Sequence, residues 1–437
     1  MMVLVQFIVF LFFILLGARL KGIGVAFAGG AGVIALSLLG AKPGDLPMLV
    51  IVFIMVVIYA ASAMQVAGGL DYLVELTDKT LRANPKLLNI TAPLITYLLT
   101  LMASTGQVSF ATMPVIVEVA KENNLRPTRA LSVGVAGSLL GITASPISAA
   151  VVFLSTQLEK GNSGWTFIDL LLVCIPATLL GTVLTATFFM FWDHARGTDK
   201  LDATPGYVPD NTRKGSVVDN LNVTRQGKLS VLLFLIALII VLAYSILISE
   251  KVGVIENPVL TAAQARIGGM LTAAGAILVL CKVDPKDIPT SSIFRTGMNA
   301  CACILGVAWL GTTFMNSNQD WIKQHLGDVI AGKPWVFAII VILASALLYS
   351  QAASTQALFP TALALGVSPA TAVACFPATS ALFIIPTYPT LLAACELDDT
   401  GTTKLGNKFF DHPFLIPGLM AVGLSVIIGF GLAQVVV

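Results

Sequence analysis

Long apolar segments recur along the whole chain, and they limit its possible folds more than any other feature. Each is close to the roughly 20 residues that an α-helix needs to cross the hydrocarbon core of a bilayer. The clearest segments cover residues 2–18, 23–40, 46–66, 167–193, 229–249, 262–281 and 413–436. Only 11% of the residues are charged, whereas about a quarter are charged in soluble domains. The sequence therefore predicts an all-α polytopic membrane protein and excludes a soluble domain.

One polar segment divides the chain into two halves. Residues 194–228 are rich in Asp, Lys, Arg, Gly, Pro and Asn and show little apolar periodicity, which is typical of a linker. We therefore predict an N-terminal transmembrane half at 1–193, a cytoplasmic linker at 194–228 and a C-terminal transmembrane half at 229–437.

The two halves contain similar short motifs in the same order, so that residues 41–158 match residues 281–397. The matched pairs are Asp45-Leu46-Pro47 with Asp287-Ile288-Pro289, Asp71-Tyr72 with Asp320-Trp321, Asn84-Pro85-Lys86 with Gly332-Lys333-Pro334, Ser104-Thr105-Gly106-Gln107 with Ser350-Gln351, and Thr143-Ala144-Ser145-Pro146 with Pro386-Thr387-Tyr388-Pro389. Several matches at similar spacing predict an internal repeat. Each repeat should contain a helical hairpin, at 86–121 and 335–366, followed by a broken helix, at 129–158 and 369–397.

The crossings between the paired motifs predict how the repeats are oriented. An odd number of crossings separates the two Asp-x-Pro motifs if each hairpin enters and leaves on the same side, and this inverts the second repeat relative to the first. We predict about ten transmembrane helices plus the two hairpins. Most of the 25 Lys and Arg residues then lie on one side, which the positive-inside rule identifies as cytoplasmic. Both termini are predicted to be periplasmic, in a bacterial inner membrane.

Polar residues inside the apolar repeats are the candidates for a binding site, because irregular backbone is tolerated at membrane depth only where it is buried in protein or lines a cavity. Gly and short hydroxyl residues can turn a hairpin and direct backbone N–H groups at an anion. Proline breaks a helix and frees the N-terminus of a half-helix. The candidate substrate-binding residues are Ser104, Thr105, Gly106 and Gln107 in the first hairpin, Thr143, Ser145 and Pro146 in the first broken helix, Ser350, Gln351, Ser354, Thr355 and Gln356 in the second hairpin, and Thr387, Pro389 and Thr390 in the second broken helix.

We expect these four elements to converge on one anion site. No Lys or Arg lies deep within the segments, so hydroxyls, carboxamides, backbone N–H groups and helix dipoles would bind the anion. Fixed counter-charges at this depth would be costly to solvate. The alternative is that the small and hydroxyl residues only allow close helix packing.

Other kinds of chemistry have little support in the sequence. The 6 Cys and 3 His residues show no metal-ligand spacing, and we predict neither a metal site nor another cofactor. A coupling ion, H⁺ or Na⁺, is left open. The net charge of +2 is too small to indicate a nucleic-acid partner. No nucleophile, base and orienting group occur together in a recognisable motif, so we do not expect an enzyme.

Several motifs together resemble a known family. They are SAMQVAGGLD at 62–71, ITASPIS at 142–148, GVAWLG at 306–311, LYSQAA at 348–353, PTYPT at 386–390, DTGTT at 399–403 and HPFLIPG at 412–418. From the first helix to the last, the chain resembles the Dcu family of anaerobic C4-dicarboxylate transporters, and its DcuA-like branch in particular. It departs from the family at the first hairpin tip, where Ser104-Thr105-Gly106-Gln107 stands in place of Gly-Thr-Gly followed by Asn or His.

The resemblance implies exchange or uptake of fumarate, malate and aspartate with succinate efflux under anaerobic conditions. It also implies kinship with elevator-type ion transporters, which are usually homodimers.

Two other functions stay open at the level of sequence. The chain could be an ion-coupled carrier of another small anion, because Ser-Thr-Gly tips can also present carbonyl oxygens to Na⁺. It could instead be a membrane regulator that contacts a sensor kinase through Asp398, Asp399 and the threonines of 400–403.

Overall fold

The structure is a computed structural model that describes residues 2–20, 23–46, 48–106, 108–161, 164–202, 221–248, 254–255, 257–331, 334–348, 350–386, 388–406 and 410–436. Over these residues the chain is helical and contains no β-strand, so the predicted all-α fold is confirmed. Residues 203–220 of the predicted linker lie outside the described ranges, as do the site candidates Gln107 and Thr387.

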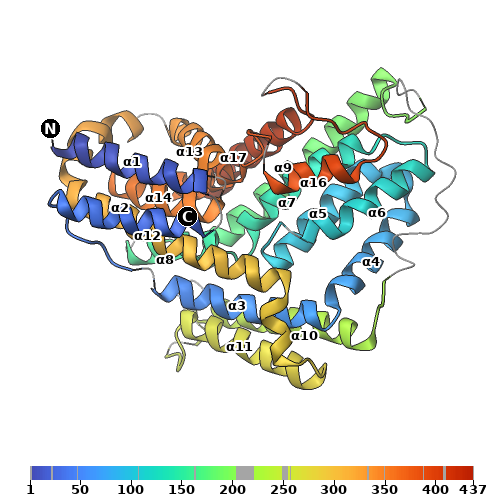
Figure 1. Cartoon of the computed structure of the whole chain (residues 1–437), viewed down its shortest axis with the longest axis horizontal. Coiled ribbons are helices and arrows are strands. Elements are labelled where there is room, and N and C mark those ends of the chain that lie inside the picture. The colour runs from blue at the N-terminus through green and yellow to red at the C-terminus, as the bar shows by residue number, and fades with distance from the viewer. Residues whose placement is uncertain are drawn as a thin grey trace.

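Helices of the N-terminal half follow one another with short connections (Figure 1). They are α1 (Met2–Leu20), α2 (Gly24–Leu38), α3 (Met48–Val66), α4 (Gly69–Ala83), the 3₁₀ turn η1 (Pro85–Leu87), α5 (Leu88–Ala103), α6 (Val108–Glu122), α7 (Pro127–Ala144), α8 (Ala149–Lys160) and α9 (Phe167–Arg196).

The C-terminal half is also built from helices, several of them short. They are α10 (Arg225–Leu247), α11 (Ala262–Leu280), the 3₁₀ helix η3 (Pro285–Thr290), α12 (Ser292–Ala331), α13 (Pro334–Leu348), α14 (Gln351–Ala364), α15 (Pro369–Cys375), the 3₁₀ helix η4 (Phe376–Ser380), α16 (Pro389–Leu397) and α17 (Leu415–Val436).

The order of elements is similar in the two halves. In the first, α3 and α4 meet at a bend of 70°, next to Gly68, whose φ of 86° favours glycine. In the second, the single 40-residue helix α12 stands in place of that bent pair. A two-helix hairpin follows in each half, α5–α6 or α13–α14, and then an interrupted helix, α7–α8 or α15–η4–α16. The inverted orientation of the halves stays a prediction.

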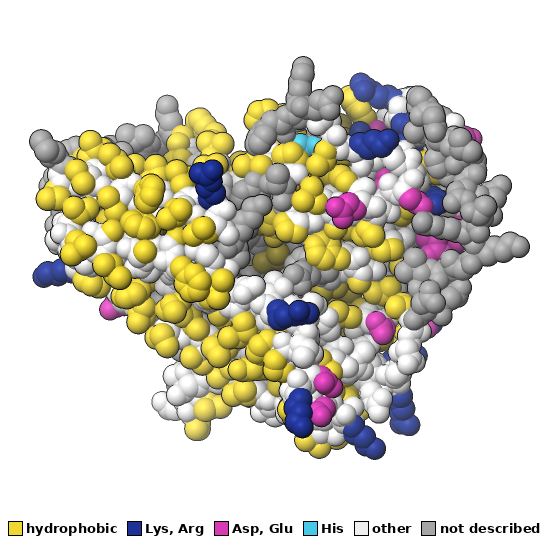
Figure 2. Space-filling model, in the orientation of Figure 1, with side chains coloured by type: hydrophobic (Ala, Val, Ile, Leu, Met, Phe, Trp, Pro, Cys, Tyr) yellow, Lys and Arg dark blue, Asp and Glu magenta, His cyan; other side chains and the backbone are white. Residues whose placement is uncertain are grey.

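Much of the outer surface is apolar. Within the described residues, six helices are long and apolar enough to cross a membrane, or seven if the bent α3–α4 pair is one span. Figure 2 shows hydrophobic side chains over broad areas with few charged side chains between them. Such a surface is costly in water and suits a lipid environment. The chain is therefore a multi-pass membrane protein, and the predicted total of about ten crossings stays a prediction.

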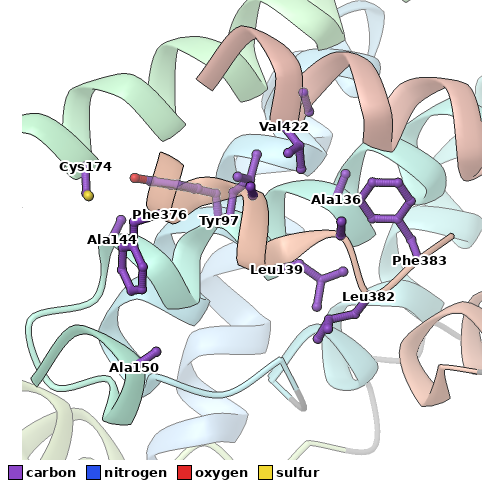
Figure 3. Close-up of a cluster of buried hydrophobic side chains, with 14 of the residues drawn as sticks. Tyr97, Ala136, Leu139, Ala144, Ala150, Cys174, Phe376, Leu382, Phe383 and Val422 are labelled. Atoms are coloured by element: carbon purple, nitrogen blue, oxygen red, sulfur yellow. The ribbon is translucent and has the colours of Figure 1, made fainter. Parts of the chain in front are cut away.

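The helices pack into two groups, each with its own main hydrophobic core, and residues of α5, α6 and α8 also contribute to the core of the second group. The first group contains α4 to α9 and α13 to α17. Its core includes Tyr97, Leu139 and Phe376 (Figure 3). The second group contains α3, α10, α11 and α12, with α1 and α2 packed on α12.

Close helix packing fixes the frame of the first group. A Cβ added at Gly141 of α7 would lie only 2.7 Å from the Tyr97 carbonyl oxygen of α5, so glycine is required for this approach. The Tyr97 hydroxyl hydrogen-bonds with the Thr178 hydroxyl of α9 over 2.9 Å. These contacts hold α5, α7 and α9 together beside the first hairpin tip and the first helix break.

Candidate substrate-binding site

A cavity of about 330 Å³ lies between the two packed groups. The hairpin tips and helix breaks form one side, and apolar residues of α3, with the start of α12, form the other. None of the described residues that line it is charged. Its small and polar lining residues are Ser104, Thr105, Gly106, Ser148, Thr296, Gly297, Ser350, Gln351, Tyr388 and Thr390.

The first hairpin tip lines the cavity with Ser104, Thr105 and Gly106. Helix α5 ends at Ala103, and Ser104 has a left-handed φ of 55° while its N–H donates to the Thr100 carbonyl over 2.7 Å. Gly106 then lies close to the second broken helix, because an added Cβ would be 3.6 Å from Cγ2 of Thr390. Helix α6 begins two residues later, at Val108.

The second hairpin tip reaches the cavity with side chains. Ser350 caps α14, since its hydroxyl oxygen accepts the Ala353 N–H over 3.2 Å. The next residue, Gln351, donates through Nε2 to the Leu139 carbonyl of α7 over 2.7 Å. Its Oε1 is buried and has no partner among the described residues.

Both interrupted helices begin again at the cavity. Ser145 and Ser148 are extended, with ψ of 121° and 138°, and α8 begins after Ser148. In the other half α16 begins at Pro389, directly after the extended residue Tyr388. Ser148 and Thr390 line the cavity, and their hydroxyls are buried and have no hydrogen-bond partner among the described residues.

Four helix N-termini thus face one cavity. The N-terminus of each helix carries a partial positive charge, which favours an anion. Some of the first N–H groups are already used, since Pro389 of α16 has none and those of Ser109, Ala353 and Leu391 donate to nearby oxygens. The termini lie in two pairs, because α14 packs on α8 and α16 packs on α6. Each pair combines one helix from each half of the chain.

The predicted site residues divide into three groups by position. Ser104, Thr105, Gly106, Ser350, Gln351, Pro389 and Thr390 line the cavity. Thr143, Ser145, Pro146, Ser354, Thr355 and Gln356 do not line it. The Thr355 hydroxyl, for example, donates to the Gln351 carbonyl of its own helix over 2.7 Å. Gln107 and Thr387 lie outside the described residues.

Some lining residues are absent from the sequence-based prediction. Ser148 had a usable signal, because a hydroxyl residue before an apolar run is typical of a helix N-cap. Tyr388 lies within the Pro386–Pro389 motif. Thr296 and Ile54 had no local signal, since only tertiary packing brings α12 and α3 to the cavity.

The residues described offer no alternative chemistry at this cavity. They contain no group of three or more His, Cys, Asp or Glu side chains that could hold a metal ion. An uncharged cavity lined by helix N-termini, between two helical groups of a multi-pass protein, is typical of a membrane carrier for small anions.

Comparison with known proteins specifies this class further. The family model described as anaerobic C4-dicarboxylate membrane transporter, DcuA_DcuB, matches residues 2–437, and the chain belongs to this family. It is 50% identical over 437 residues to the C4-dicarboxylate transporter DcuA of Escherichia coli strain K12, covering 99% of both chains. Identity to DcuA of Wolinella succinogenes is 47%, covering 99% of this chain and 100% of that one. The Anaerobic C4-dicarboxylate transporter DcuB of Escherichia coli O6:H1 is 34% identical, with 98% of both chains covered. Like its relatives the chain is a transporter, not an enzyme.

Two solved structures share the fold at low sequence identity. The YdaH transporter of Alcanivorax borkumensis has a TM-score of 0.56 and 14% identity, covering 87% of this chain and 84% of its own. MtrF of Neisseria gonorrhoeae has a TM-score of 0.60 and 11% identity, covering 89% of this chain and 80% of its own. These similarities support a transporter-like fold for the chain.

Proposed function

We propose that this protein exchanges or takes up C4-dicarboxylates such as fumarate, malate and aspartate across the bacterial inner membrane, with succinate leaving the cell during anaerobic growth. The observation that carries the proposal is the convergence of four helix N-termini on one cavity whose described lining residues are uncharged. The family membership agrees with this substrate class.

The paired N-termini suit a ligand with two carboxylates. One carboxylate would lie between α8 and α14, near the Ser148 hydroxyl and the Ser350 N-cap. The other would lie between α6 and α16, near Gly106 and the Thr390 hydroxyl. The unpartnered hydroxyls can donate to carboxylate oxygens, and such charge-assisted bonds are roughly twice as strong as neutral ones.

The absence of charge among the described lining residues suits reversible transport. A buried Lys or Arg that lost its anion would be left desolvated and unpaired, at a cost of several kcal/mol. Helix dipoles and hydroxyls supply a weaker field, so the empty and loaded sites differ less in energy. This favours release on both sides of the membrane.

Movement would follow from the two packed groups. We propose that α3 and the start of α12 belong to a scaffold, and that the group with both hairpins moves against it in an elevator-like way. In this proposal the halves are inverted repeats, both termini are periplasmic, and the protein is a homodimer. No cofactor is proposed.

Transport by purified protein in liposomes tests the proposal. Vesicles loaded with succinate should take up labelled fumarate, malate or aspartate, and should not take up monocarboxylates or citrate. Failure with every C4-dicarboxylate would remove the main function. Repeating the assay with and without Na⁺ separates simple exchange from the ion-coupled alternative.

A contact between the 398–403 loop and a sensor kinase is a lesser proposal. The Asp398 carboxylate accepts hydrogen bonds from the N–H groups of Thr400 and Thr403, and Asp399 pairs with Lys121 at 2.8 Å. Because both carboxylates already have partners within the chain, the structure favours a local structural role for them.

A further inference from the structure

A second cavity, of about 490 Å³, lies at the ends of several helices in the group that carries the hairpins. Asn89 comes from the start of α5, Thr128 from the start of α7 and Ile416 from the start of α17, while Asp193 comes from the end of α9. None of the candidate substrate-binding residues that the structure describes lines it. Three helix N-termini therefore meet at a site that transport does not explain.

The lining of this cavity carries both signs of charge. Among the described residues, its basic residues are Arg126, Arg129 and Lys404, and its acidic residues are Asp193, Asp199 and Asp411. Arg129 and Asp193 form an ion pair at 2.6 Å and largely satisfy each other. A site with balanced charges favours a ligand that itself carries a positive and a negative group.

Two buried acceptor atoms in the wall lack partners among the described residues. They are Oδ1 of Asn89 and Nδ1 of His412, and His412 is only 8% exposed. The Nε2 atom of His412 lies 3.3 Å from the Ile384 carbonyl oxygen. Because a carbonyl only accepts, Nε2 carries the hydrogen and Nδ1 of the neutral ring presents a lone pair. Burial lowers the pKa of His412, which keeps the ring neutral. A ligand with N–H or O–H donors that reach these atoms would satisfy them.

The cavity lies at an edge between apolar and polar surface. At the end of α9 the Arg196 guanidinium stacks 4.1 Å above the Trp192 ring, and tryptophan with neighbouring basic residues is typical of the membrane–water interface. Ile416 lines the cavity and is also 69% exposed. A ligand in the cavity could therefore extend an apolar tail along the start of α17.

We propose that this cavity binds the headgroup of a phospholipid that carries both a phosphate and a primary ammonium, as phosphatidylethanolamine does. The phosphate lies at the N-termini of α7 and α17, near Arg126 and Lys404. The ammonium donates to His412 Nδ1 and Asn89 Oδ1 beside Asp411, and the acyl chains follow Ile416.

Native mass spectrometry of the full-length protein tests this assignment with three lipids. Phosphatidylethanolamine should stay bound after delipidation and bind at least about tenfold more tightly than the other two. Phosphatidylcholine has the same charges without N–H donors, and phosphatidylglycerol has hydroxyl donors without a cation. Equal retention of either lipid would overturn the proposal. Competition by soluble phosphoethanolamine at similar affinity would assign the site to a free metabolite instead of a lipid.

Variants of the lining residues test whether the lipid binds in this cavity. Lys404→Gln, at an exposed position, should fold normally and weaken phosphatidylethanolamine binding about tenfold, while Lys86→Gln, also exposed but outside the cavity, should not. His412→Phe keeps a ring and removes the acceptor, and should reduce the preference over phosphatidylcholine. If His412→Phe fails to fold, Lys404→Gln decides the matter. Unchanged binding in Lys404→Gln would contradict the proposal.

Discussion

The two hairpin tips meet the same cavity but are built from different chemistry. The first tip is a backbone turn, in which Ser104 is left-handed and Gly106 leaves space beside Thr390. The second tip depends on side chains, because Ser350 caps its helix and Gln351 bonds to α7. Equivalent places in the two halves of the chain are therefore built by unlike means. Side-chain substitutions should therefore have larger effects at the second tip.

The largest expected effect is that of Gln351→Leu. This change removes the Nε2 bonds to the Leu139 carbonyl and the Ser380 hydroxyl, at 2.7 and 3.2 Å, and leaves the Ser380 hydroxyl as the remaining side-chain donor to that carbonyl. Losing two hydrogen bonds worth up to about 1.5 kcal/mol each should lower fumarate exchange by up to about a hundredfold. The initial rate of fumarate counterflow in liposomes measures it.

Gln356→Leu is the matched control for that change. Gln356 lies on the same helix and is 1% exposed. Neither its side-chain oxygen nor its side-chain nitrogen has a hydrogen-bond partner among the described residues. It does not line the cavity, so the variant should transport nearly as well as the wild type. If both variants lost the same amount of transport activity, the loss would come from altered packing and not from the binding site.

At the first tip, Gly106→Val should weaken fumarate binding about tenfold. A Cβ at this position meets Ser138 and Thr390 at ordinary contact distances of 3.5 and 3.6 Å, so the extra methyl groups would press on the neighbours or enter the cavity, at a cost of about 1–3 kcal/mol. Gly106→Ala should have a smaller effect. Isothermal titration with fumarate compares the two, and equal affinities for Val and wild type would remove this tip from the site.

The smallest effects concern stability and should differ in sign between the tips. Ser350→Ala removes the N-cap of α14 and should destabilise the protein by about 1 kcal/mol. Ser104→Gly relieves a left-handed φ of 55° and should be neutral or stabilise by up to about 1 kcal/mol. Thermal unfolding in detergent measures both. If Ser104→Gly destabilised the protein, the contacts of the Ser104 side chain would contribute more to stability than the left-handed backbone costs.

The sequence predicts those parts of the fold and site that depend on local chemistry. Apolar length predicts the membrane helices, and glycine and proline predict where the chain turns or breaks. Pro389 begins α16, and Pro146 lies in the turn that links α7 to α8. Ser104, Gly106 and Gln351 accordingly line the cavity.

Other features depend on helix phase and tertiary packing, which short motifs do not encode. Thr355 is near the second tip in sequence, but one turn into α14 its hydroxyl bonds to the helix backbone. Thr296 comes from a distant helix and carries no local signal. The bend between α3 and α4 requires the left-handed Gly68, whereas the continuous α12 at the matching place shows that similar motifs can form different helices.

In the proposed site, two pairs of helix N-termini hold the two carboxylates of one substrate. Measuring the binding of fumarate and of monomethyl fumarate to wild type, Ser148→Ala, Thr390→Val and the control Thr355→Val tests this arrangement. We expect the monoester to bind the wild type far more weakly than fumarate. Ser148→Ala and Thr390→Val should each weaken fumarate binding about tenfold to a hundredfold, a loss of about 1–3 kcal/mol, with Thr355→Val near wild type. Wild-type fumarate affinity in both Ser148→Ala and Thr390→Val would contradict the account.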